Sequence, residues 1–175
     1  MTWAEANLLS LKAEYIQGTL NVRADWLSRQ TLQEAEWALN PRTFSEISRR
    51  FGKPLVDLFA TDRNRQVPRF FSRYPHPEAE ATNALVTIWP KELLYAFPPL
   101  PLLPRVLRRI QTLQAEVILV APKWPRRPWF STLVQLSCQP HLVLPVSPDL
   151  LAQGPIWHPD PAWWHLTVWR LSGKP

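Results

Sequence analysis

The sequence has one cysteine, Cys138, and four glycines among its 175 residues. A single cysteine excludes a disulfide framework within the chain, and four scattered histidines without a cysteine or carboxylate at ligand spacing predict no metal site. No apolar run reaches transmembrane length, and nothing near Met1 combines the basic lead and apolar run of a signal peptide. We therefore expect an intracellular protein, cytoplasmic or nuclear, without a membrane partner.

Aromatic residues and prolines are abundant instead. Ten tryptophans, seven phenylalanines and a hydrophobic content of 46% argue against disorder, whereas twenty prolines predict frequent breaks in regular structure. Twenty lysines and arginines against fourteen acidic residues give a net charge of +6, which favours polyanionic partners such as nucleic acid. The length suits one domain with appendages.

Residues 1–40 divide into a strand and a helix. Leu9, Leu11, Ala13 and Tyr15 alternate with polar residues, as in a half-buried strand. A turn follows, and Asn21 is a suitable N-cap for a helix that ends at residues 40–41, Asn-Pro. One strand and one helix are too little for an independent domain.

Residues 41–147 have the pattern of an α/β domain. Thr43 and Glu46 stand at capping-box spacing before a short helix over 44–51, and Gly52 follows it. The continuous apolar run 53–61 predicts a strand buried on both faces of a parallel sheet. Alternating helices and strands are then expected over 105–114, 115–122, 129–137 and 141–146.

The last segment, residues 148–175, is rich in proline and tryptophan, and we expect an irregular tail or linker there. Prolines also recur every third residue from Pro98 to Pro104 and from Pro122 to Pro128. This is polyproline II spacing, which an SH3-type partner could bind.

The stretch YIQGTLNVRADWLSR, residues 15–29, resembles the end of the ribonuclease H domain of retrotransposon reverse transcriptases. The resemblance implies that residues 1–40 are the C-terminal remnant of such a domain. It also implies that Asp25 is the last of four metal-binding carboxylates, with the other three upstream of Met1. One carboxylate cannot hold two divalent ions about 4 Å apart, so Asp25 alone is inactive.

A second resemblance covers residues 43–145. The segments PLVDLFAT, NRQVPRFFS, NALVTIWP, YAFPPL, EVILVAPKWP and PWFSTL follow one another as in the methyltransferase-like domain of DIRS-like retrotransposons. That domain is itself similar to phage DNA N6-adenine methyltransferases. The resemblance implies a three-layer, Rossmann-like, methyltransferase-type sheet. If the site is retained, S-adenosylmethionine is its cofactor, with Asp57 and Phe59 assigned to cofactor binding; otherwise no cofactor is expected.

By the same resemblance, YAFPPL corresponds to the loop that grips the target base. In amino-methyltransferases an Asp or Asn precedes the two prolines and accepts hydrogen bonds from the exocyclic amine, and an aromatic ring after them stacks on the flipped base. Here the loop is Phe97, Pro98, Pro99 and Leu100. Because phenylalanine cannot accept a hydrogen bond, we expect a degenerate loop. The Pro-Pro pair also predicts an extended, exposed backbone.

Two segments interleave cations with aromatic residues, a pattern that can follow phosphates while rings stack on bases. The candidate nucleic-acid residues are Arg63, Arg65, Arg69, Arg73, Lys123, Trp124, Arg126, Arg127 and Trp129. We therefore interpret the chain as a retrotransposon-derived fragment whose methyltransferase-like domain at most binds nucleic acid. Two alternatives stay open: a protein-interaction module that uses the proline runs, and an active S-adenosylmethionine-dependent DNA N6-adenine methyltransferase.

Overall fold

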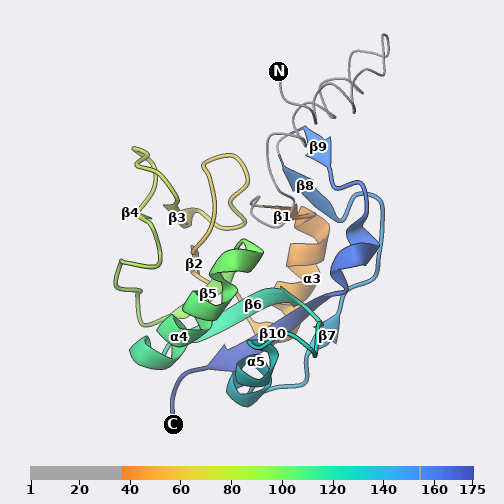
Figure 1. The fold of residues 1–175 in the computed structure, drawn as a ribbon. Helices are drawn as coiled ribbons and strands as arrows, with labels where there is room; N and C mark the ends of the chain where they lie inside the picture. Colours follow the sequence, from red (N-terminus) through yellow and green to blue (C-terminus); the bar gives the residue numbers. More distant parts are fainter. Residues whose placement is uncertain (1–36, 154) are drawn as a thin grey trace, which may run out of the picture. The chain divides into compact units, whose positions relative to one another are not determined.

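The computed structural model describes residues 37–153 and 155–175, which form an α/β unit around a mixed seven-stranded sheet (Figure 1). The strand order is β4-β3-β2-β5-β6-β10-β7. A smaller antiparallel sheet has the order β1-β8-β9 and consists of β1 (Ala38–Leu39), β8 (Leu151–Gln153) and β9 (Ile156–Trp157). Among the described residues, no helix is both long and apolar enough to cross a membrane.

Five neighbouring strands of the large sheet run parallel. They are β2 (Val56–Asp57), β3 (Arg69–Ser72), β4 (Ala81–Thr82), β5 (Leu93–Ala96) and β6 (Glu116–Pro122). The sixth, β10 (Leu166–Ser172), is antiparallel to β6 along seven residue pairs and to β7 (Leu142–Val143) on its other side. The strands of the centre are therefore buried on both faces, as the apolar runs at 53–61 and 115–122 predicted.

Helices cover both faces of this sheet. The helices α4 (Leu103–Leu113) and α5 (Phe130–Leu136) bury Val106, Ile110 and Leu133 in a core cluster with alternate residues of β5 and β6. The helix α3 (Pro41–Phe51) lies on the other face, where Phe44 packs edge-on against Tyr95 of β5 at 5.0 Å (Figure 1). The predicted helices at 44–51, 105–114 and 129–137 are thus confirmed as elements.

The start of α3 differs from the prediction. Asn40, rather than Thr43, is the N-cap, because its side-chain oxygen accepts from the backbone N–H of Arg42 at 2.8 Å while Pro41 fills the first helical position. Asn40 also donates to Asp149, which ties this helix end to the C-terminal segment. Gly52 ends α3 with a φ of 107°, and its N–H donates to the carbonyl of Ser48.

Residues 38–39 correct the end of the helix predicted to run up to Asn40. Ala38 and Leu39 form strand β1 and pair with Ala152 and Leu151 of β8. Apart from that end, the predictions for residues 1–36, including the strand at 9–15, the Asn21 cap and Asp25, lie outside the described residues.

The irregular tail predicted for residues 148–175 is also wrong. This segment supplies β8, β9, the 3-10 helix η2 (Pro161–Trp164) and β10. Strand β10 occupies an interior position between β6 and β7, and Val168 and Leu171 are fully buried. The strand is hard to predict because Thr167, Arg170 and Ser172 interrupt its apolar residues, so that β10 lacks the continuous apolar run of a strand covered on both faces.

The position of β10 predicts a large stability cost for a C-terminal substitution. We expect Leu171→Ala to lower the free energy of unfolding by about 2–5 kcal/mol, because it leaves a cavity in the core. The control Val143→Ala, at a side chain that is 60% exposed on β7, should cost less than about 0.5 kcal/mol. Urea unfolding of both variants measures the difference, and equal small effects would contradict the placement of β10.

Candidate functional site

The loops that follow the parallel strands meet at one edge of the sheet. Strand β2 lies between β3 and β5, so the chain continues to one side of β2 for β3 and β4 and to the other for β5 and β6. In open α/β sheets, ligands bind at the carboxyl ends of the strands that flank such a switch point. Here those ends are Asp57 on β2 and Ala96-Phe97 on β5, with Asp57 in register with Tyr95.

Asp57 is held by the polypeptide backbone. Its side chain is 2% exposed, and its carboxylate oxygens accept the N–H groups of Phe59 at 3.3 Å and Gln66 at 3.1 Å. The carboxylate therefore fixes the start and the end of the β2–β3 connection. Phe59 is partly buried and packs against the core cluster. Neither residue presents a polar group on an open surface.

Tyr95 lies beside Asp57 and is also buried. Its hydroxyl has no hydrogen-bond partner among the described residues, and its ring contacts Phe44 of α3. Burial, together with the negative charge of Asp57, raises the pKa of Tyr95 well above its ordinary value. The phenol is therefore neutral at physiological pH.

The loop Phe97-Pro98-Pro99 is closed off from solvent, which corrects the exposed backbone predicted from the proline pair. Phe97 is 5% exposed, both prolines are buried, and Leu100 is half-buried. The ring of Trp164, at the end of η2, packs edge-on against Phe97 with centroids 6.3 Å apart. Trp164 is 1% exposed, and its indole N–H donates to Nε2 of His158 at 2.7 Å. The indole ring of Trp164 thus shields the phenyl ring of Phe97 from solvent.

The proline runs do not form exposed polyproline II segments in this structure. Residues 100–102 are the 3-10 helix η1 (Leu100–Leu102), and Pro104 lies in the first turn of α4. Pro122 is the last residue of β6, and residues 125–126 and 128–129 are turns. The three-residue spacing instead reflects two strand ends, each leading into a helix.

Cations and aromatic rings gather after β6. The guanidinium of Arg127 lies 4.6 Å from the centre of the Trp124 ring, and Trp124 packs edge-on against Trp163 of η2 at 5.0 Å. Trp163 is 38% exposed. Lys123, Arg126 and Arg127 make no ion pair within the described part of the chain. We call the set Lys123, Trp124, Arg126, Arg127 and Trp163 the β6 cluster.

The remaining candidate nucleic-acid residues fall into two groups. Arg63 and Arg73 are exposed and make no ion pair with the described residues, whereas Arg65 pairs with Glu78 at 3.1 Å. Arg69 forms a bidentate pair with Glu80 at 2.6 and 2.8 Å, which raises the pKa of Arg69 and lowers that of Glu80. Trp129 is 8% exposed and belongs to the core, so it cannot stack on a base.

A cleft of about 790 Å³ lies at the β2–β3 connection. Arg63, Asn64 and Gln66 line one side, and the half-exposed Trp157 of β9 lines another. The cleft therefore adds a surface of mixed polar and apolar side chains to the loops at the carboxyl edge. Among the described residues, no group of three or more His, Cys, Asp or Glu side chains could hold a metal ion.

Sequence reasoning missed the residues that come from the C-terminal segment. Trp163 and Trp164 point to opposite environments, one exposed and one buried, because η2 turns the chain just before β10. The signal for this turn was present, since Pro161 follows Asp160 as a proline follows a helix cap. This signal locates η2 only when residues 166–172 are also predicted to form a strand.

Comparisons with known proteins leave the family open. No family model matches the sequence, and no curated protein matches it either.

The buried phenol of Tyr95 predicts that the protein loses stability at alkaline pH and that Tyr95→Phe prevents this loss. A tyrosine in the unfolded chain ionises near pH 10, whereas the raised pKa keeps folded Tyr95 neutral to higher pH. Above about pH 10 ionisation therefore stabilises the unfolded state alone, and the free energy of unfolding falls as the pH rises. At pH 7 we expect the free energy of unfolding of Tyr95→Phe to equal that of the parent or to exceed it by up to about 1 kcal/mol, because the hydroxyl has no hydrogen-bond partner among the described residues.

The advantage of Tyr95→Phe over the parent should grow above about pH 10, by up to about 1.4 kcal/mol per pH unit. Urea unfolding across pH 7–11 measures it, with Tyr74→Phe, at a side chain that is 67% exposed, as the control that should show no such growth. A clear loss of stability at pH 7 would mean that the Tyr95 hydroxyl makes a stabilising bond.

Proposed function

We propose that residues 37–175 form a methyltransferase-like α/β domain that has lost methyl transfer and binds single-stranded nucleic acid through the loops at the carboxyl edge of its sheet. The retrotransposon origin suggested by the resemblances at residues 15–29 and 43–145 belongs to the same proposal. The observation that carries it is the contrast at one edge: the target-base loop is covered, while the adjacent β6 cluster stays open and cationic.

The strand order supports the methyltransferase-like part. A parallel sheet with its first strand at the centre and a reversed strand, β10, between β6 and β7 is what we expect of the methyltransferase-type sheet that the sequence resembles. The positions of two segments that carry the resemblance also support it, because each follows a parallel strand. VDLFA lies at the end of β2, and YAFPPL lies at the end of β5.

The residues at the carboxyl edge do not fit methyl transfer by S-adenosylmethionine. The carboxylate of Asp57 is buried and already accepts two backbone N–H groups. Phe97 supplies no acceptor for an amine, and Trp164 covers it. Loss of one positioned hydrogen-bonding group in an active site typically costs a factor of roughly 100–1,000 in rate. A flipped base would also have to displace a buried tryptophan.

The β6 cluster supports the nucleic-acid part. Lys123, Arg126 and Arg127 carry charges that no described carboxylate neutralises, so they can replace the counterions of a phosphate backbone. The exposed ring of Trp163, held by Trp124 and Trp164, offers a platform for an unpaired base. A flat ring beside cations favours single strands, because the bases of a duplex have no free face.

A salt titration with a fluorescent oligothymidylate of about 20 nucleotides tests this function. For single strands the logarithm of affinity falls with the logarithm of salt by about 0.7 per phosphate contact, so Lys123→Gln/Arg126→Gln/Arg127→Gln should reduce the slope by about 2. Arg49→Gln/Arg50→Gln/Lys53→Gln removes the same charge from α3 and the residues after it and should leave most of the affinity. Salt-independent binding, or equal losses in both triple variants, would overturn the proposal.

The aromatic platform makes a separate prediction. Trp163→Ala should weaken binding of the same oligonucleotide by about 1–3 kcal/mol with little change in the salt slope, because a stacked ring carries no charge. The control Ile88→Ala alters a side chain that is 81% exposed on the β4–β5 connection and should not change the affinity. Anisotropy titrations at constant salt give both values, and an unaltered affinity for Trp163→Ala would exclude stacking on this ring.

A further inference from the structure

A second surface lies at the opposite edge of the sheet, where the parallel strands begin. A groove of about 640 Å³ runs between α3 and the residues that lead into β2 and β3. Phe44, Pro54, Leu55, Val67 and Pro68 give it an apolar lining. Leu55 is 42% exposed, so the groove includes apolar surface that no described residue covers.

The groove has the position of a missing helix. On the opposite face, α4 and α5 pack side by side over the sheet, whereas α3 is the one helix of the described residues that packs on this face. The β2–β3 and β3–β4 connections, residues 58–68 and 73–80, contain no helix that could cover the sheet beside α3. A crossover between parallel strands usually supplies one.

Dimensions fit a short amphipathic helix. The wall formed by residues 44–53 of α3 and its C-cap region is about 14 Å long at 1.5 Å per residue, which matches two to three helical turns. A helix laid along α3 at the usual interaxial distance of about 8–10 Å would place its apolar side chains on Leu55, Val67 and Pro68.

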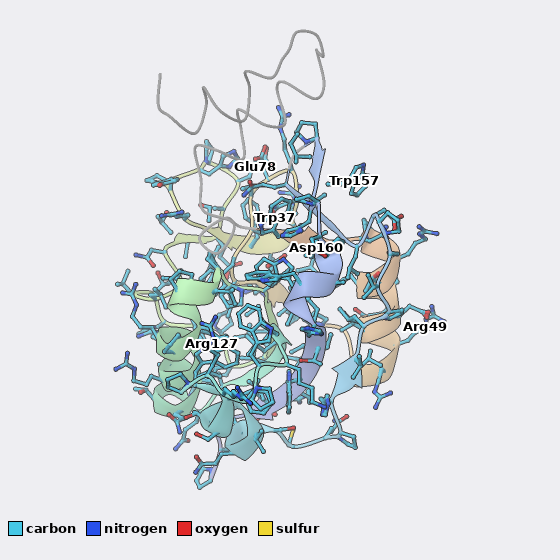
Figure 2. The ribbon with its side chains drawn as sticks, turned by 45° about the vertical axis from the view of Figure 1, so that its right-hand side comes forward. Trp37, Arg49, Glu78, Arg127, Trp157 and Asp160 are labelled. Atoms are coloured by element: carbon cyan, nitrogen blue, oxygen red, sulfur yellow. The ribbon has the colours of Figure 1, made fainter. Side chains whose placement is uncertain are left out.

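The charged side chains at the rim of the groove indicate the charge of the partner. Arg49, Lys53 and Arg69 line the groove; Arg49 pairs with Glu46 at 3.2 Å and Arg69 pairs with Glu80 at 2.6 Å, which leaves Lys53 as the cation of the rim without a described carboxylate. The Arg49 side chain is 75% exposed and points outward from α3, on the opposite side of the molecule from Arg127 in Figure 2. Lys53 makes no ion pair with the described residues. A second copy of this chain would bring like charges together across a two-fold interface, which disfavours self-association.

We propose that this groove, which we call the α3 groove, binds an amphipathic helix with acidic flanks from a partner protein. The apolar face of that helix covers Leu55 and Val67, and a carboxylate of its flank meets Lys53. The site is independent of the β6 cluster because the two lie at opposite edges of the sheet. It does not depend on the proposed nucleic-acid binding.

Two labelled peptides of about 14 residues test the proposal on the full chain. Both carry leucines at helical spacing on one face, one with glutamates and the other with lysines on the flanks. We expect saturable anisotropy binding of the acidic peptide, at least tenfold weaker binding of the basic one, and a loss of at least fivefold with Lys53→Glu. Binding of neither peptide, or equal binding of both, overturns the proposal.

The variant Leu55→Glu places a charge on the groove lining and should abolish peptide binding. Its side chain is 42% exposed, so the fold should tolerate it, and an unchanged midpoint of urea unfolding shows that the domain is intact. Val86→Glu, at a side chain that is 75% exposed, is the matched control and should bind the peptide normally. Sedimentation velocity supplies the rival result: a dimer that Leu55→Glu dissociates would assign the groove to a second copy and overturn the proposal.

Discussion

The contact between Trp164 and Phe97 determines what the carboxyl edge of the sheet can do. Trp164 is fixed from one side by its hydrogen bond to His158 and from the other by the start of β10, and its ring closes the loop after β5. In an active DNA amino-methyltransferase of the kind we propose as an ancestor, that loop must be open to an incoming base. A buried pair of apolar rings there is favourable for folding and incompatible with gripping an amine.

The same C-terminal segment that closes one part of the edge shapes another. Trp163, one residue earlier in η2, is turned outward and packs against Trp124, which in turn stacks with Arg127. The β6 cluster is therefore a product of β10 being threaded between β6 and β7, because this threading brings η2 beside the end of β6. Closure of the loop after β5 and exposure of the cationic β6 cluster have one structural cause.

Strongly periodic or uniformly apolar segments could be predicted from the sequence. Val106, Leu107 and Ile110 face one side of α4, and β6 is apolar from Val117 to Pro122. Strands β3 and β5 have four residues each, too few to show a period, and their parallel partners are far away in the sequence. The proline pair predicts an exposed loop, but Trp164, which covers this loop, comes from residues 148–175, whose composition predicts a tail. Ion pairs such as Arg69 with Glu80 likewise decide which cations are available, and composition cannot reveal them.

Calorimetric titration of the full chain with S-adenosylmethionine tests the central claim most directly, because it measures whether the carboxyl edge binds the cofactor of the methyltransferases that we propose as its relatives. With Asp57 engaged by backbone N–H groups and Phe97 buried under Trp164, we predict no saturable heat of binding at concentrations up to millimolar. Tight uptake of one equivalent per chain would contradict the account, since it would require an open edge and a carboxylate free to meet a ligand.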